Sequence, residues 1–178
     1  MSTSLSPDDS EQVRILKARA AVLAREPESA PEGEHIEIIE FLLAEERYAL
    51  ESPCIGEVYP LRELTPLPCT PAFVLGVVNI RGKILSVLDL RRFFDLPVNG
   101  LSDLNKVIVL RNDTMEFGIL ADVIVAARRI PLQALQPSLP TLTEIRAEYL
   151  LGVTEERLVV LDGRKILADP GIVVHEEV

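Results

Sequence analysis

The sequence of 178 residues carries 28 acidic and 18 basic side chains, which gives a net charge of −10. Nonspecific binding to nucleic acid or to anionic lipid depends on clustered lysine and arginine, so this charge argues against both kinds of partner. Hydrophobic residues make up 48% of the chain but aromatic residues only 4%, which predicts a core built mainly from aliphatic side chains.

The first 34 residues are predicted to form an amphipathic helix and an acidic linker. Over residues 6–25, Ser6 can act as the N-cap, Pro7 suits the first turn, and apolar residues recur at helical spacing: Val13, Leu16, Ala20 and Leu23. Residues 26–34 contain two prolines, a glycine and four glutamates, which end the helix. We expect the apolar stripe to pack on the folded domain or on a partner, because it would otherwise be exposed.

We expect neither a secretion leader nor a membrane segment in this chain. The N-terminus is polar and acidic, without a basic region followed by an apolar one. No apolar run reaches the roughly 18 residues of a membrane helix, so we expect no direct membrane insertion. Cys54 and Cys69 lack the spacing of a disulfide framework, which predicts reduced thiols and a cytoplasmic protein.

From His35 onward the pattern becomes that of strands. Residues 36–43 and 47–51 predict a hairpin, residues 53–64 a further extended stretch, and residues 65–73 a proline-rich loop that cannot join a sheet. The next segment, VVNIRGKILSVLDLRR at residues 77–92, predicts two apolar strands around a tight turn, with the second strand ending at Asp89.

The second half of the chain repeats this organisation. Residues 106–130 predict a hairpin that turns at Asn112–Asp113, with a return strand that runs on past Asp122. A proline-punctuated loop at residues 131–149, a last hairpin at 150–162 and a short helix or turn at 163–169 follow.

A faint internal repeat supports a fold of two similar β units. Tyr48-Ala49-Leu50 corresponds to Phe117-Gly118-Ile119, and each is followed by a Leu-Gly-Val strand, a polar turn and an aliphatic strand that closes in Leu-Asp. Half-buried sheets of about five strands curl into barrels, because closure buries one face and hides the edges. The expected fold class is therefore mainly β, with two small five-stranded barrels that share a hydrophobic core.

Signatures of catalysis and of cofactor binding are missing from the sequence. It contains no glycine-rich phosphate loop, and the cysteines lack the Cys-x-x-C spacing of a metal site. His35 and His175 stand apart from other candidate ligands. Asp89 and Asp122 end apolar strands, where a carboxylate usually caps a turn or pairs with arginine. We therefore expect no enzyme activity, no metal and no cofactor.

Two short stretches are candidates for binding. In the turn of the 77–92 hairpin, Arg81 is either a solvated residue beside Gly82, which supplies a positive φ, or a rigidly presented cation that anchors a partner's carboxylate or carbonyl, with Asn79 beside it. In CIGEVYP, Glu57 lies between Ile55 and Val58. That stretch is either a second binding patch or one more core strand.

The segment RYALESPCIGEVYPLRELTPLPCTPAFVLGVVNIRGKILSVLDLRRFF resembles the CheW-type coupling proteins of bacterial chemotaxis. The shared features include the Glu-Val dipeptide, the Leu-Pro-x-x-Pro loop, the Asn-aliphatic-Arg-Gly turn and the Asp-Leu-Arg motif that follows the second strand of the hairpin. The resemblance extends over about residues 36–168. It implies two SH3-like five-stranded barrels and a non-enzymatic adaptor that joins the helical hairpin of a chemoreceptor tip to the regulatory domain of a CheA-type histidine kinase.

Carried over position by position, the resemblance implies a set of receptor-facing residues: Ile55, Glu57, Val58, Asn79, Arg81 and Gly82. Gly76 matches a family glycine that is tied to coupling, and Asp89 matches the aspartate of the family's Asp-Leu-Arg motif. Kinase-contacting positions are not assigned by motif. The implied domain is residues 35–170, preceded by the helix and linker at 1–34 and followed by a tail at 171–178, in a cytoplasmic protein recruited to receptor arrays.

Three alternatives remain. The chain could be an enzyme that uses Asp89 or Asp122, although no base, metal or phosphate site supports this. It could be a stand-alone regulatory module that binds a small ligand between the barrels. Because the N-terminal helix lies outside the resemblance, it could also be a coupling protein dedicated to a non-flagellar chemosensory pathway.

Overall fold

The computed structural model describes residues 33–137 and 147–172. The helix expected at residues 6–25 and the end of the tail, residues 173–178, lie outside these described residues. The described strands follow in chain order: β1 (His35–Leu43), β2 (Glu46–Glu51), β3 (Ile55–Pro60), β4 (Val74–Ile80), β5 (Lys83–Leu88), β6 (Lys106–Arg111), β7 (Glu116–Ala121), β8 (Val123–Pro131), β9 (Leu150–Val153) and β10 (Val159–Leu161). The short helical elements are η1 (Ser52–Cys54), α2 (Leu90–Phe93), η2 (Leu132–Ala134) and α4 (Gly163–Ala168).

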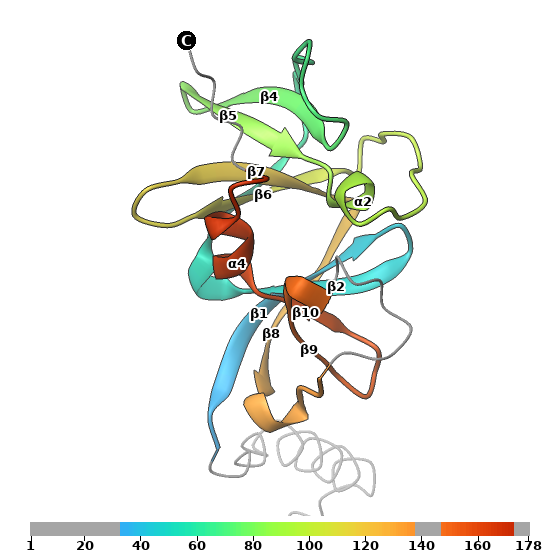
Figure 1. Ribbon diagram of the computed structural model, residues 1–178, viewed down its shortest axis with the longest axis vertical. Helices are drawn as coiled ribbons and strands as arrows, with labels where there is room; N and C mark the ends of the chain where they lie inside the picture. Colours follow the sequence, from blue (N-terminus) through green and yellow to red (C-terminus); the bar gives the residue numbers. More distant parts are fainter. Residues whose placement is uncertain (1–32, 138–146, 173–178) are drawn as a thin grey trace, which may run out of the picture. The chain divides into compact units, whose positions relative to one another are not determined.

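The strands form two five-stranded sheets that pack on one another (Figure 1). One sheet has the order β8-β1-β2-β10-β9, and we call it sheet A. The other has the order β3-β6-β7-β5-β4, and we call it sheet B. The mainly β fold with two five-stranded units, expected from the sequence, is confirmed.

The internal repeat corresponds to the same strand pairing in each sheet. In sheet A, β10 runs parallel to β2, so that residues 159–161 pair with Tyr48-Ala49-Leu50. In sheet B, β5 runs parallel to β7, so that residues 87–88 pair with Gly118-Ile119. Both motifs of the repeat are therefore central strands, which explains why they read as continuous apolar runs.

Each Leu-Asp pair ends a strand and starts a short helix. Asp89 is the N-cap of α2 and accepts a hydrogen bond from the Arg91 backbone N–H. Asp162 is the N-cap of α4 and accepts bonds from the backbone N–H groups of Arg164 and Lys165. An aspartate side chain satisfies donors that the first helical turn leaves unpaired. The expected capping role of Asp89 is confirmed.

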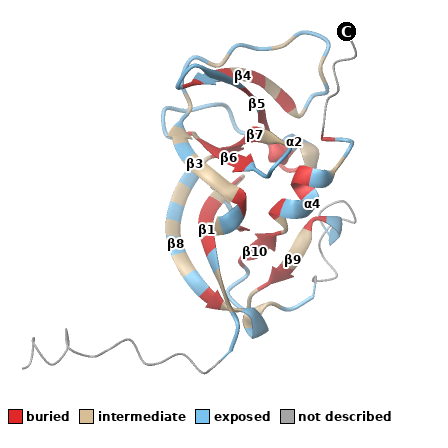
Figure 2. Cartoon of the chain, turned by 90° about the vertical axis from the view of Figure 1, so that its left-hand side faces the viewer, coloured by how far each residue is buried: buried red, intermediate tan, exposed pale blue. Residues whose placement is uncertain are grey.

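The hydrophobic core has a shared part and a smaller cluster in each sheet. Phe41 and Tyr48 of sheet A and Ile108 and Ile119 of sheet B belong to one buried cluster. Figure 2 shows buried segments on strands of both sheets. Two further clusters lie on the other faces, one around Val107 of sheet B and one in sheet A. The shared core expected from the sequence is therefore present, and Cys54 is buried in it.

The segment around Asp122 differs from the expectation. The return strand of the 106–130 hairpin does not run on as one strand: β7 ends at Ala121, and β8 leaves sheet B to pair with β1 of sheet A. The Asp122 carboxylate accepts a hydrogen bond from the Ala44 backbone N–H at 2.8 Å. Asp122 thus links the crossover between the two sheets to the turn between β1 and β2.

Candidate functional site

The turn between β4 and β5 holds Arg81 in an uncommon backbone conformation. Arg81 has φ of 53° and Gly82 has φ of 83°, so both turn residues are left-handed, as a two-residue hairpin of matching twist requires. The expectation that Gly82 supplies a positive φ is confirmed, and Arg81 adopts a positive φ as well. The Asn79 side chain accepts a hydrogen bond from the Gly82 N–H at 2.8 Å, which stabilises this turn.

The Arg81 side chain projects into solvent beside β3. Its side chain is 78% exposed, its Nη1 lies 3.5 Å from the Glu57 carboxylate, and its guanidinium carbon lies 5.4 Å from the centre of the Tyr59 ring. Because β3 and β4 are the outermost strands of sheet B, this contact joins the two edges of the sheet. An exposed ion pair of this kind contributes little stability and leaves most guanidinium donors open to a partner.

The two faces of β3 separate the predicted receptor-facing residues into two groups. Glu57 pairs with Val109, which belongs to the cluster around Val107 of sheet B. The Glu57 side chain therefore points to the same side of β3 as Arg81. Ile55 and Val58 pair with residues of the shared core on the opposite face. The structure therefore brings Glu57, Asn79, Arg81 and Gly82 together, but not Ile55 and Val58 with them.

Exposed valines also occur on β8, which the sequence did not single out. Val58 is 37% exposed, and Val123 and Val125 of β8 are 38% and 49% exposed. Figure 2 shows β3 and β8 along the same side of the molecule. Val123 and Val125 alternate with less exposed residues along β8. The same alternation is typical of a strand that only contributes to the core, so the sequence pattern alone does not indicate a binding surface here.

Gly76 is required by a close backbone approach. Val77 forms a two-way backbone pair with Thr65, and a Cβ on Gly76 would lie 2.2 Å from the Thr65 carbonyl oxygen. Its φ of 149° is also one that side chains rarely allow. Gly76 therefore lets the proline-rich loop close over the outer edge of β4.

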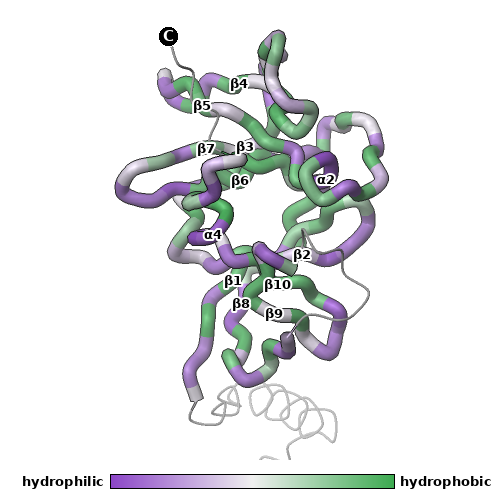
Figure 3. Tube along the Cα trace, viewed as in Figure 1, coloured by the Kyte–Doolittle hydropathy of each residue, from purple (hydrophilic) through white to green (hydrophobic). Residues whose placement is uncertain are grey.

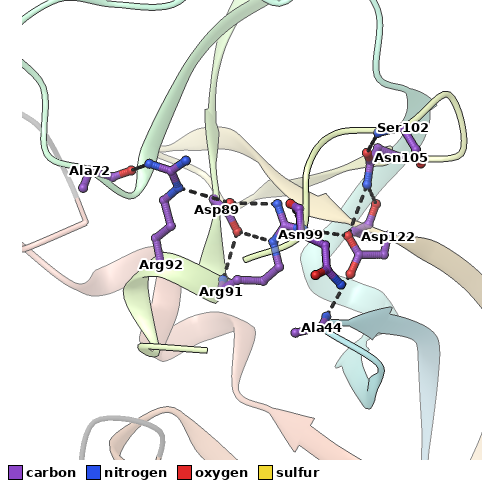
Figure 4. A network of polar contacts seen from close by, with 10 residues as sticks. Ala44, Ala72, Asp89, Arg91, Arg92, Asn99, Ser102, Asn105 and Asp122 are labelled. Atoms are coloured by element: carbon purple, nitrogen blue, oxygen red, sulfur yellow. Dashed lines mark hydrogen bonds and ion pairs between the residues drawn. The ribbon is translucent and has the colours of Figure 1, made fainter. Parts of the chain in front are cut away.

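Asp89 belongs to a buried charge network that the sequence did not reveal (Figure 4). Its carboxylate accepts hydrogen bonds from Nε and Nη2 of Arg91, both at 2.9 Å, and neither side chain is more than 1% exposed. The hydrogen bonds to Asp89 raise the pKa of Arg91, so the guanidinium stays charged. Both charges are thereby compensated, as burial demands.

Asp122 completes this network. Its Oδ1 accepts from Arg91 Nη1 at 3.0 Å and from the Asn105 side-chain amide at 3.2 Å, while its Oδ2 binds Ala44. The network therefore links α2, the loop after it, the crossover between sheets and the β1–β2 turn. Since Asp89 and Asp122 are both engaged with Arg91, they act as structural carboxylates, as expected.

Among residues 33–137 and 147–172, no group of three or more His, Cys, Asp or Glu side chains could hold a metal ion. No described helix is long and apolar enough to span a membrane. Cys54 is buried, and this burial raises the pKa of its thiol.

One pocket of about 440 Å³ lies on sheet B. Its lining is mainly apolar and includes Val74, Leu88, Phe117 and Ile172, with Thr70, Ser86 and Glu116 as the polar members. A pocket of this size can accept a small ligand or a partner's side chain.

Taken together, the architecture defines a β-barrel scaffold whose charged side chains serve as caps, structural pairs and surface contacts. The family model of the CheW-like domain matches residues 37–171, and the chain belongs to that family. It is similar to chemotaxis protein CheW of Treponema pallidum, with 28% identity over 146 residues that cover 78% of this chain and 86% of that protein. Protein FrzA of Myxococcus xanthus is 35% identical over 115 residues, which cover 65% of this chain and 71% of that protein.

A solved structure gives the same result. The crystal structure of scaffolding protein TtCheW from Thermoanaerobacter tengcongensis matches with a TM-score of 0.67 and 26% identity, over 78% of this chain and 96% of that one. The resemblance read from the sequence is confirmed. The protein is a CheW-like scaffold of chemotaxis or a related chemosensory pathway, in a family of non-enzymatic proteins.

Proposed function

We propose that this protein couples the cytoplasmic helical hairpin of a chemoreceptor to the regulatory domain of a CheA-type histidine kinase, in the cytoplasm at receptor arrays. The observation that carries the proposal is the exposed guanidinium of Arg81 on a turn that Asn79 holds rigid. A preorganised cation loses little conformational freedom when it binds a carboxylate or carbonyl. We propose residues 35–170 as the coupling domain, with 1–34 and 171–178 as additions to it.

The receptor-facing surface is proposed to have an apolar part and a polar part. Val58 of β3 and the exposed valines of β8 supply aliphatic surface that suits the apolar stripe of a helix. Glu57 and Arg81 form the polar part, where a partner can exchange the internal ion pair for an intermolecular one. Ile55, Asn79 and Gly82 shape these two parts, while Gly76 and Asp89 hold the barrel beneath them.

In this mechanism no covalent bond is made or broken. The scaffold holds receptor and kinase at the same time, and a receptor that changes state favours one conformation of the kinase over another. The extent of activation is set by the difference between the binding free energies of the two states.

The test compares Arg81→Glu with Arg129→Glu in pull-downs of a receptor cytoplasmic fragment and of a kinase regulatory-domain fragment. Arg129 is a matched control because it is also exposed, at 65%, and pairs with a glutamate, Glu37, at 2.9 Å. We expect Arg81→Glu to lose receptor capture while Arg129→Glu retains it. Equal capture by the two variants would refute the proposed site, and absence of receptor capture by the wild-type chain would refute the proposed coupling.

The pocket on sheet B favours one other function, that of a module that responds to a small ligand. Calorimetry with metabolite mixtures and with the receptor fragment separates the two functions. Tight binding of a metabolite without any receptor binding would support the ligand module instead of the coupler.

A further inference from the structure

The loop between α2 and β6, residues 95–105, exposes three large apolar side chains. Val98, Leu101 and Leu104 are 46%, 51% and 66% exposed, and all three lie within residues 98–104. The loop projects beside α2, at the right of Figure 1 and of the hydropathy view in Figure 3. Single exposed apolar residues are ordinary, but several gathered in one short loop indicate a surface that is covered by a partner.

The loop has a defined conformation. The Asn99 carbonyl accepts a hydrogen bond from Arg91 Nη1 at 3.2 Å. Asn105 is 2% exposed, and its side chain accepts from the Ser102 backbone N–H at 2.5 Å and donates to Asp122. The Asn105 carbonyl also accepts from the backbone N–H of Leu61 at 3.0 Å. Because both halves of the loop are fastened to the buried network, a partner would have little conformational entropy to remove on binding.

The charged residues within the loop are acidic, while Arg92 of α2 and Lys106 of β6 flank its two ends. Asp95 and Asp103 are exposed, and residues 95–105 contain neither lysine nor arginine. Glu45 is exposed in the β1–β2 turn, next to Ala44, whose N–H is bonded to the same Asp122 carboxylate that holds Asn105. The loop and the turn thus meet at one carboxylate, and both present negative charge to solvent.

We propose that the loop of residues 95–105 is a docking surface for a basic amphipathic helix of a partner protein. Val98, Leu101 and Leu104 contact the apolar face of the helix, and Asp95, Asp103 and Glu45 attract the lysines and arginines that flank it. The acidic rim disfavours an anionic membrane surface as the occupant. This surface shares no residue with the receptor-facing set around Arg81, so the inference is independent of the proposed function.

The test uses the full chain and two fluorescein-labelled synthetic helices of identical apolar face, one with lysine and one with glutamate on the polar face. Fluorescence anisotropy should show binding of the lysine helix only, and weaker binding at higher salt. The double variant Leu101→Ser/Leu104→Ser should weaken this binding by about tenfold or more, because most interface energy resides in a few buried apolar contacts. Asp103→Lys should weaken it as well.

Ile84→Ser is the matched control, because Ile84 is another exposed apolar residue, at 62%, on β5. It should bind the lysine helix like the wild-type chain, and urea unfolding should show that the loop variants remain folded. Three results would each overturn the inference: unchanged binding by the double variant, equal binding of the two helices, or an equal loss in Ile84→Ser. Self-association of the wild-type chain that the double variant abolishes would also overturn it, since the occupant would then be a second copy.

Discussion

Gly76 of β4 and Gly152 of β9 occupy equivalent positions in the two sheets. Each precedes a valine that forms a two-way backbone pair with a loop residue: Val77 with Thr65, and Val153 with Gln136. A Cβ on Gly152 would lie 2.8 Å from the Leu135 Cβ, much as a Cβ on Gly76 would meet the Thr65 carbonyl. The two halves of the molecule therefore cover an outer strand in the same way, by laying a loop across a glycine.

The first prediction concerns this close approach. Gly76→Ala should lower the free energy of unfolding by about 2–4 kcal/mol, because the new methyl group would overlap a backbone carbonyl that cannot rotate away. Gly100→Ala is the control, since a Cβ there meets nothing within 4 Å. Urea unfolding followed by circular dichroism measures both variants. A loss below about 0.5 kcal/mol in Gly76→Ala, well outside the expected range, would show that the Thr65 loop is not held against β4.

The fold was predictable from the sequence where short patterns repeat. Leu-Gly-Val and Leu-Asp occur once in each half, and both mark equivalent strands and helix caps in the structure. The pairing within the hairpins was predictable and is confirmed. The pairing between distant strands was not, because β2 and β10 are separated by most of the domain and nothing in an apolar run specifies its partner. The change of sheet at Asp122 was missed for the same reason, since β7 and β8 form one extended apolar stretch in the sequence.

The site was predictable only in part. A cation beside a glycine in a tight turn indicates exposure, and Arg81 is exposed. Its contact with Glu57 depends on how the sheet curls, which strand periodicity does not report. Arg91 lies in the same Asp-Leu-Arg-Arg segment as the exposed Arg92, and only the tertiary structure shows that Arg91 alone is buried.

The second prediction concerns the buried network. Arg91→Met should destabilise the protein by about 3–5 kcal/mol, because it leaves the buried Asp89 carboxylate with only the longer ion pair to the half-exposed Arg92, at 3.6 Å. The double variant Asp89→Asn/Arg91→Met should recover part of that loss, since the buried and weakly compensated carboxylate charge is removed. Chemical unfolding of both variants tests this.

Arg129→Met serves as the comparison for the second prediction. Its ion pair with Glu37 lies in solvent, so the variant should change the free energy of unfolding by less than about 1 kcal/mol. Similar losses in Arg91→Met and Arg129→Met would contradict the assignment of Arg91 to a buried, charge-compensated site.

The third prediction concerns pH. Partial burial raises the pKa of the Glu51 carboxyl, and the nearby Asp162 carboxylate raises it further, against an opposing effect of Arg164. A carboxyl whose pKa is higher in the folded state destabilises the fold when it is ionised, and this penalty disappears once the pH falls below its ordinary value of 4.5. Glu51→Gln should therefore stabilise the protein at neutral pH, by no more than about 1 kcal/mol at this partly exposed position.

Thermal unfolding of wild type and Glu51→Gln across pH measures this effect. The melting temperature of the variant should exceed that of the wild type at pH 7, and the two should converge near pH 4 as Glu51 becomes protonated. A difference that stays constant from pH 7 to pH 4 would mean that the substitution acts through packing and not through the charge.

The fourth prediction uses the contact between Glu57 and Arg81. Neither single reversal, Glu57→Arg or Arg81→Glu, should change the free energy of unfolding by more than about 1 kcal/mol, because the pair is exposed and its closest atoms are 3.5 Å apart. The double reversal restores the internal ion pair with its polarity inverted.

If the pair of Glu57 and Arg81 serves only the fold, the double variant should capture the receptor fragment like the wild type. If a partner binds the cation at position 81, as we propose, capture of the receptor fragment should remain low in the double variant although its stability equals that of the wild type. Parallel measurement of unfolding and capture on the same four proteins decides between these outcomes, and full recovery of capture in the double variant would remove Arg81 from the binding surface.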